Sequence, residues 1–185
     1  MPRIEPLSGA RAPLLLRLFN VLLRRVAGRE IVPFNIMGYS PGLLLPYVFM
    51  TAFTRGGKLD PRVRLLAMHR VSELNGCSWC LDYGSSLAQE LDIPPEKLRD
   101  LANYQNSTAF TPRERAAIAF AEAVTQVGGG VDDTEFADLK HHFSDREIVE
   151  LLAALCAENF FNRFNVALEV ESQGFCALPP LTSAA

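Results

Sequence analysis

Helical periodicity along almost the whole chain is the feature that most restricts its fold. Apolar residues recur at helical spacing, strand-like alternation is absent, and glycines and prolines fall between segments of helix length. Hydrophobic residues make up 49% of the 185 residues, which is enough for one sizeable core. The sequence therefore predicts an all-α fold of about seven to eight helices.

The breakers divide the chain into helices of ordinary length. We expect helices at residues 13–27, 41–54, 61–74, 77–91, 95–104, 112–128, 133–142 and 145–171, and an irregular connection at 28–40. Capping sequences precede three of them: Asp60 before Pro61, Thr111 with Glu114, and Ser144 with Glu147. We interpret residues 1–58 as an N-terminal helical extension packed on a compact core of residues 59–174, followed by a flexible tail at 175–185.

The charge of the chain argues against nucleic acid as a partner. The formal net charge is −3, whereas a nucleic-acid binder carries a basic stripe. No apolar run reaches membrane-spanning length, and the N-terminus lacks the pattern of a signal peptide. We therefore expect a cytoplasmic protein with no membrane partner. The leucine-rich helix at 13–27 carries three arginines, and packing on the domain or on a partner subunit is favoured over a membrane-surface role.

Cys77 and Cys80 form a C-x-x-C pair, in which the two thiols lie one helical turn apart. A disulfide at this spacing closes a small, easily reduced ring, which is typical of redox chemistry, although the same pattern can form half of a metal site. A zinc site would need two further ligands, and the adjacent His141 and His142 point to different faces of a helix. We therefore expect redox chemistry with no metal and no bound cofactor. Cys156, inside an apolar run, is interpreted as a core residue.

Two side chains upstream of the pair could move protons for the thiols. His69, Glu73 and Cys77 are spaced four apart, so they share one face if the helix continues past Asn75. Our hypothesis is that Glu73, with His69, acts as a proton relay. The alternatives are a core or surface histidine for His69 and a solvated helix-end carboxylate for Glu73. A helix that starts near Asn75 and Gly76 would direct its positive dipole end at Cys77, which favours Cys77 as the more acidic thiol.

Two further polar features leave a structural and a functional interpretation open. Asp82, two residues after the pair, could be a cap, an ion-pair partner or a catalytic group. Asn159, Asn162 and Arg163 interrupt an apolar helix and share a face. They could form a buried polar network or one wall of a pocket, and the network is slightly favoured.

Residues 59–84 resemble the core motif of the carboxymuconolactone decarboxylase superfamily. The branch they most resemble is the alkylhydroperoxidase D-like one, which carries the C-x-x-C pair, and the run from Asn75 to Cys80 is its most specific part. A weaker similarity extends over residues 111–174 and includes the run from Glu158 to Arg163. The resemblance implies an alkylhydroperoxidase D-like helical bundle that assembles as a homo-oligomer, a trimer or hexamer with a dimer possible.

The same resemblance implies a peroxidase that reduces organic hydroperoxides. Cys80 would attack the peroxide and Cys77 would resolve the sulfenic acid to a disulfide, with electrons from a lipoyl-bearing or thioredoxin-like dithiol partner. The branch's proton relay is missing at the three matched positions. Leu65 stands in place of its glutamate, and Trp79 and Gly84 stand in place of its two histidines.

Two alternative functions remain at this stage. The first is an enzyme like the lactone decarboxylases of the superfamily, against which the cysteine pair counts because those members generally lack it. The second is a non-catalytic thiol sensor whose disulfide reports an oxidant, which the missing relay residues keep open.

Overall fold

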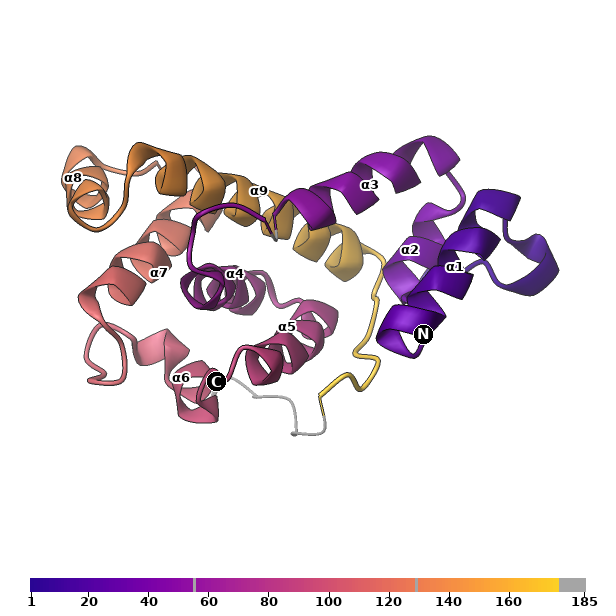
Figure 1. Ribbon diagram of the computed structural model, residues 1–185, viewed down its shortest axis with the longest axis horizontal. Helices are drawn as coiled ribbons and strands as arrows, with labels where there is room; N and C mark the ends of the chain where they lie inside the picture. The colour runs from indigo at the N-terminus through magenta and orange to yellow at the C-terminus, as the bar shows by residue number, and fades with distance from the viewer. Residues whose placement is uncertain (55, 129, 177–185) are drawn as a thin grey trace.

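The molecule is built from helices throughout the part of the chain that the structure describes. The computed structural model describes residues 1–54, 56–128 and 130–176, and these contain nine α-helices, two 3₁₀ turns and no strand (Figure 1). The helices are α1 (Leu14–Ala27), α2 (Val32–Met37), α3 (Pro41–Phe53), α4 (Pro61–Asn75), α5 (Ser78–Glu90), α6 (Pro95–Arg99), α7 (Pro112–Thr125), α8 (Asp133–His142) and α9 (Asp145–Ala167). The 3₁₀ turns are Gly9–Arg11 and Leu101–Asn103. The predicted all-α fold is confirmed.

Helix α4 forms the centre of the molecule. It packs against α5, α7 and α9, and Figure 1 shows it enclosed by them. Leu66, Ala67 and Val71 have no exposed surface, because α4 has neighbours on several sides. Since residues of α4 face both α5 and α9, the helix can bring polar side chains from three elements to one place.

The two ends of α4 are set by local chemistry. At its start, the Asp60 side chain accepts a hydrogen bond from the Arg62 N–H at 2.8 Å, and Pro61 occupies the first turn. At its end, Gly76 has a left-handed backbone with φ of 67°, which a residue with a Cβ adopts only at a cost. The predicted interruption at Asn75 and Gly76 is therefore confirmed, and it places the cysteines at the start of a new helix.

The predicted capping boxes are present. Thr111 with Glu114 opens α7, and Ser144 with Glu147 opens α9. A third box, Asp132 with Glu135, opens α8. In each box the side chain of the first residue accepts from the backbone three residues on, and the glutamate bonds back to the first residue's N–H. These reciprocal bonds explain why the helix starts were readable from the sequence.

The structure corrects the predicted helices at four places. The helix expected at 95–104 is a short helix, Pro95–Arg99, followed by the 3₁₀ turn Leu101–Asn103, and the helix expected to reach residue 128 ends at Thr125. The predicted irregular connection contains α2, because Phe34, Ile36 and Met37 bury their side chains in the core and thereby stabilise a short helix. The last helix ends at Ala167 and not near Glu171, and Glu169 follows in a left-handed conformation with φ of 53°. Residues 168–176 then form a non-helical segment, which we call the C-terminal segment.

The N-terminal helices pack where the cysteines lie. Leu16, Phe34 and Tyr47 belong to the same hydrophobic cluster as Cys77 and Cys80. Figure 1 places α1 and α2 at one end of the molecule, with α7 and α8 at the other. The division into an extension at 1–58 and a core at 59–174 stays a prediction, and residues 177–185 of the expected tail lie outside the described residues. No helix in the described ranges is long and apolar enough to cross a membrane.

Candidate active site

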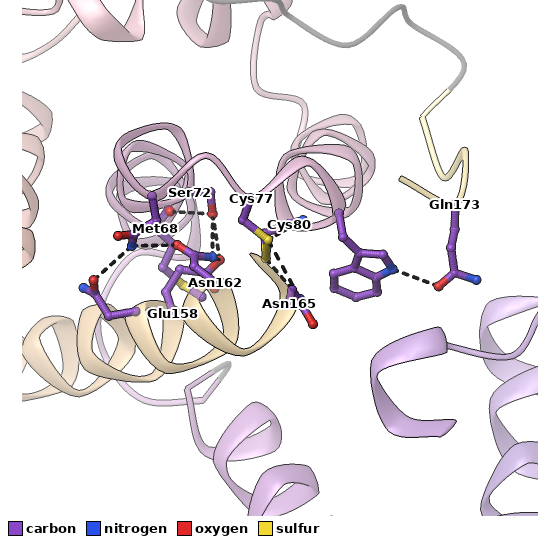
Figure 2. The surroundings of a disulfide bond; sticks show 11 residues. Met68, Ser72, Cys77, Cys80, Glu158, Asn162, Asn165 and Gln173 are labelled. Atoms are coloured by element: carbon purple, nitrogen blue, oxygen red, sulfur yellow. Dashed lines mark hydrogen bonds between the residues drawn. A yellow bond between two sulfur atoms is a disulfide. The ribbon is translucent and has the colours of Figure 1, made fainter. Parts of the chain in front are cut away.

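The cysteine pair lies at the first turn of α5, buried under other elements. Cys77 and Cys80 are joined by a disulfide, with their Cα atoms 5.3 Å apart, and they are 1% and 6% exposed (Figure 2). Cys77 is the N-cap of α5, and its Sγ accepts the backbone N–H of Cys80 at 3.3 Å. The chain therefore places the pair where unpaired helix amides and the positive end of the helix dipole favour a thiolate.

One amide from α9 contacts both sulfurs. Asn165 Nδ2 donates to Cys80 Sγ at 3.4 Å and, at longer range, to Cys77 Sγ at 3.8 Å (Figure 2). Asn165 is fully buried, and its Oδ1 has no hydrogen-bond partner among the described residues. Its N–H groups can stabilise negative charge on either sulfur in the reduced state. The sequence analysis missed Asn165; the signal was its place on the same helix face as Asn162, three residues earlier.

A largely apolar cavity of about 490 Å³ opens against α5. Its aromatic wall consists of Phe19, Phe34, Tyr47, Trp79, Tyr83 and Phe161. Among the described residues, Cys80 lines the cavity and Cys77 does not. A molecule in the cavity therefore meets Cys80 first, and the polar groups His69, Ser72 and Glu158 line the same space.

His69 occupies the space beside position 84. A Cβ added to Gly84 would lie 2.8 Å from His69 Nδ1, too close for any real side chain. The ring is 2% exposed, and its Nδ1 has no hydrogen-bond partner among the described residues. Burial lowers the pKa of His69 to about 4, so the imidazole is neutral at physiological pH. The His69 ring, from α4, thus occupies the space into which a histidine at position 84 of α5 would extend.

Glu73 lies apart from the cysteines. Because α4 ends at Asn75, Cys77 is not one helical turn beyond Glu73, and the predicted alignment of the two is wrong. The Glu73 carboxylate pairs with Arg70 at 2.8 Å, and Arg70 also pairs with Glu122 at 2.7 Å. Burial raises the pKa of Glu73, while Arg70 partly opposes that shift. Glu73 is not among the described residues that line the cavity, and its relay role stays a prediction.

A polar network joins α4 to α9 beside the cavity. Glu158 Oε1 accepts hydrogen bonds from Ser72 Oγ and from Asn162 Nδ2, both at 2.7 Å (Figure 2). Asn75 Nδ2 donates to the side-chain oxygens of Asn162 at 3.1 Å and Asn159 at 3.0 Å. The expected network of Asn159 and Asn162 is therefore confirmed, whereas Arg163, which was expected to share it, is exposed.

Asp82 anchors the C-terminal segment. Its carboxylate accepts the backbone N–H groups of Gln173, Phe175 and Cys176 at 2.9–3.1 Å and the Ser172 hydroxyl at 2.8 Å. Burial alone would raise the pKa of Asp82, but these hydrogen bonds, that of Cys176 foremost, hold it below its usual value. Of the interpretations left open for Asp82, the structure supports the structural one.

Gln173 ties the C-terminal segment to the cysteine helix and to the loop before α2. Its Oε1 accepts from Trp79 Nε1 at 2.8 Å (Figure 2). The same oxygen accepts from the Val32 N–H at 2.9 Å. Its Nε2 donates to the Glu30 carbonyl at 3.0 Å. One side chain thus connects three segments next to Cys80.

The other cysteines and the histidine pair take no part in this site. Cys156 is exposed on α9, so the expectation that it lies in the core is wrong. The described residues hold no group of three or more His, Cys, Asp or Glu that could bind a metal ion.

The helical fold, together with a disulfide whose Cys80 lines an apolar cavity, defines an alkylhydroperoxidase D-like helical protein. The model of the Carboxymuconolactone decarboxylase family matches residues 45–123. The uncharacterized protein YnjA of Escherichia coli strain K12 is 33% identical over 178 residues, which cover 95% of this chain and 97% of YnjA. The chain belongs to the carboxymuconolactone decarboxylase family, in its alkylhydroperoxidase D-like branch.

Solved structures agree with this placement. ATU0492 of Agrobacterium tumefaciens, a protein of unknown function with a proposed antioxidant role as AhpD, aligns with a TM-score of 0.70 and 27% identity. The alignment covers 74% of this chain and 94% of ATU0492. An uncharacterized peroxidase-related protein from Ralstonia eutropha JMP134, an AhpD core, aligns with a TM-score of 0.81 over 94% of each chain. At 19% identity, it shows the shared fold alone.

Proposed function

We propose that this protein is a thiol-dependent peroxidase that reduces organic hydroperoxides through Cys77 and Cys80. The observation that carries the proposal is that Cys80 lines a largely apolar cavity while its disulfide partner lies outside the cavity wall. An apolar cavity favours the hydrocarbon part of an organic hydroperoxide, and a thiolate in its wall can attack the peroxide oxygen. The reaction needs no bound cofactor.

The proposed cycle balances with a dithiol as reductant. The Cys80 thiolate attacks the terminal oxygen of ROOH, the O–O bond breaks, and Cys80 becomes a sulfenic acid while ROH leaves with one proton. The Cys77 thiol then attacks Cys80 Sγ and forms the S–S bond with loss of water. An external dithiol reduces the disulfide and is itself oxidised.

Two features bear on which thiol attacks. The Cys80 N–H donates to Cys77 Sγ, which supports Cys77 as the more acidic thiol. Access supports Cys80, because Cys80 is the one that lines the cavity. We assign the attack to Cys80, since a thiolate that does not meet the substrate cannot react. His69 lies in the same cavity as a neutral imidazole able to hydrogen-bond the bound peroxide.

The burial of both sulfurs favours a slender electron donor. A dihydrolipoyl arm can enter a cavity, whereas the flat surface of a thioredoxin-like protein could reach these sulfurs only after a covering segment moved. A lipoyl-bearing partner is therefore proposed first and a thioredoxin-like one second. We also propose a cytoplasmic homo-oligomer, a trimer or hexamer with a dimer as the smaller alternative, because exposed leucines on α1 need covering.

Turnover of cumene hydroperoxide with dihydrolipoamide tests the function. We expect many turnovers in the wild type and none in Cys80→Ser, and, when the dithiol is omitted, a single oxidation in Cys77→Ser that leaves a sulfenic acid reactive to dimedone. The loss in Cys80→Ser should be at least about a thousandfold, because the nucleophile is removed. Full turnover in Cys80→Ser would refute the assignment, and a single turnover in the wild type would favour the thiol sensor. A lactone substrate that is decarboxylated would favour the decarboxylase alternative.

A further inference from the structure

Glu158 is a buried carboxyl group in the wall of the cavity that holds Cys80. It lies on α9, is 8% exposed, and lines the cavity together with Ser72 and His69. None of the ion pairs among the described residues includes Glu158, although Arg64 lines the same cavity. A carboxyl group kept in such surroundings is more stable protonated than ionised.

The hydrogen bonds of Glu158 orient it and leave one oxygen available. Ser72 Oγ and Asn162 Nδ2 both donate to Oε1, so both fixed bonds hold the same oxygen. Oε2 has no hydrogen-bond partner among the described residues, and it is not among their fully enclosed, unpaired polar atoms. A proton on Oε2 can therefore be offered to a molecule in the cavity.

Breaking the O–O bond of an alkyl hydroperoxide creates a need for such a proton. The leaving alkoxide is a strong base, and its departure is much faster when an acid protonates it during bond breaking. Leu65, Trp79 and Gly84 line the cavity, and none of them has a side chain that can supply a proton in this way. A donor must come from another position in the cavity wall.

Two other ionisable groups that face the cavity, His69 and Tyr47, are poorer donors. His69 of α4 is neutral at physiological pH because burial lowers its pKa to about 4. Tyr47 of α3 has its pKa raised chiefly by burial. Arg64 of α4, Tyr83 of α5 and Glu90 at the end of α5 complete the set besides Cys80. Burial raises the pKa of Glu158, although Ser72 and Asn162 partly oppose the shift.

We propose that Glu158 is the acid that protonates the leaving oxygen of the hydroperoxide. This role rests on the proposed peroxidase function and deepens it. The proton of Glu158 Oε2 goes to the departing RO⁻, which gives ROH, while the former Cys80 thiolate becomes the sulfenic acid. Glu158 then regains a proton from the next Cys80 thiol as that thiol ionises, so each cycle leaves the carboxyl unchanged.

The test compares two oxidants that differ in their leaving group. Cumene hydroperoxide releases an alkoxide that needs a proton, whereas peroxyacetic acid releases acetate, which does not. Oxidation of the reduced protein can be followed by stopped-flow fluorescence, because Trp79, the chain's one tryptophan, adjoins Cys80. The variants are Glu158→Gln, which keeps the shape of the side chain, and Glu122→Gln as a control for losing a half-buried carboxylate outside the cavity.

Glu158→Gln should slow oxidation by cumene hydroperoxide at least about a hundredfold and oxidation by peroxyacetic acid less than about threefold. Alkylation of Cys80 by iodoacetamide, which needs no acid, should stay within about threefold in every variant. In the wild type, the rate with cumene hydroperoxide should fall as pH rises through the pKa of Glu158. That fall should be absent with peroxyacetic acid over the pH range in which the peracid itself stays protonated, and this comparison needs no variant.

Three results would overturn the proposal. They are full reactivity of Glu158→Gln with cumene hydroperoxide, an equal loss with both oxidants, or a loss confined to a third variant, Glu73→Gln, which would support the relay hypothesis instead. Failure of the peroxidase function itself looks different, because the wild type would then be inert to cumene hydroperoxide while still reacting with peroxyacetic acid.

Discussion

At the scale of single residues, burial fixes which groups of the site carry charge. His69 is neutral because the cavity wall offers its ring neither solvent nor an acidic partner among the described residues, and its pKa falls to about 4. In the unfolded chain the same imidazole titrates near its ordinary value of 6.5. The difference makes the stability of the fold depend on pH.

The sign of this dependence follows from proton binding. As pH falls below about 6.5, the unfolded state binds a proton at His69 that the folded state does not, so the free energy of unfolding decreases until pH reaches about 4. The full effect is about 3 kcal/mol. Chemical denaturation between these pH values should show this loss in the wild type but not in His69→Gln. Parallel curves for the two proteins would contradict it.

The residues of the site differed in how far the sequence could reveal them. Cys77 and Cys80 were predictable because their pattern is local and specific. Whether Glu73 lies beside Cys77 depended on whether α4 continues past Asn75. The left-handed backbone at Gly76 ends the helix there. Glu158 could not be assigned a role, because it contacts Ser72 from 86 residues away and only the packing of two helices brings them together.

At the scale of elements, helix starts were predictable and helix ends less so. Capping boxes have a fixed three-residue spacing, so α7 and α9 could be read directly. Helix α2 is six residues long and depends on buried apolar contacts rather than on local preference, and the sequence analysis therefore took it for an irregular loop.

The C-terminal segment is an element without helical hydrogen bonds, and it depends on Asp82. In Asp82→Ala, three backbone N–H groups lose a charged acceptor, and each such bond contributes about 1.5 to 3 kcal/mol. Hydrogen exchange at Gln173, Phe175 and Cys176 should accelerate at least about tenfold, while exchange in α9 should not change. Equal protection in both proteins would show that Asp82 is not the anchor.

At the scale of the whole molecule, knowing which segments are helical does not tell which helices pack against one another. The sequence predicted the class of fold, but the packing of α1 to α3 around the cysteines is a long-range result of shape. That packing leaves one face of α1 uncovered, where Leu14, Leu18, Val21 and Leu22 are 52–70% exposed. The expected homo-oligomer would cover this face.

Light scattering after gel filtration tests the assembly. The wild type should have a mass that is a multiple of 20.5 kDa, and the double variant Leu18→Lys with Val21→Lys should weaken association at least about tenfold. Val127→Lys is the matched control, because Val127 is 88% exposed and lies away from α1. A monomeric wild type would exclude the assembly. An assembly that survives the double variant would place the contact elsewhere on the surface.

Position 84 has a consequence for how relatives of this protein are recognised. A side chain at position 84 would have to displace the imidazole of His69, so this space suits one histidine ring, which can enter it from either of two helices. Natural sequences should therefore divide into two complementary types, one with the ring on α4 and glycine on α5, the other with the reverse. A search that demands histidine at a fixed offset from the cysteines would discard the first type, although the imidazole is present in both.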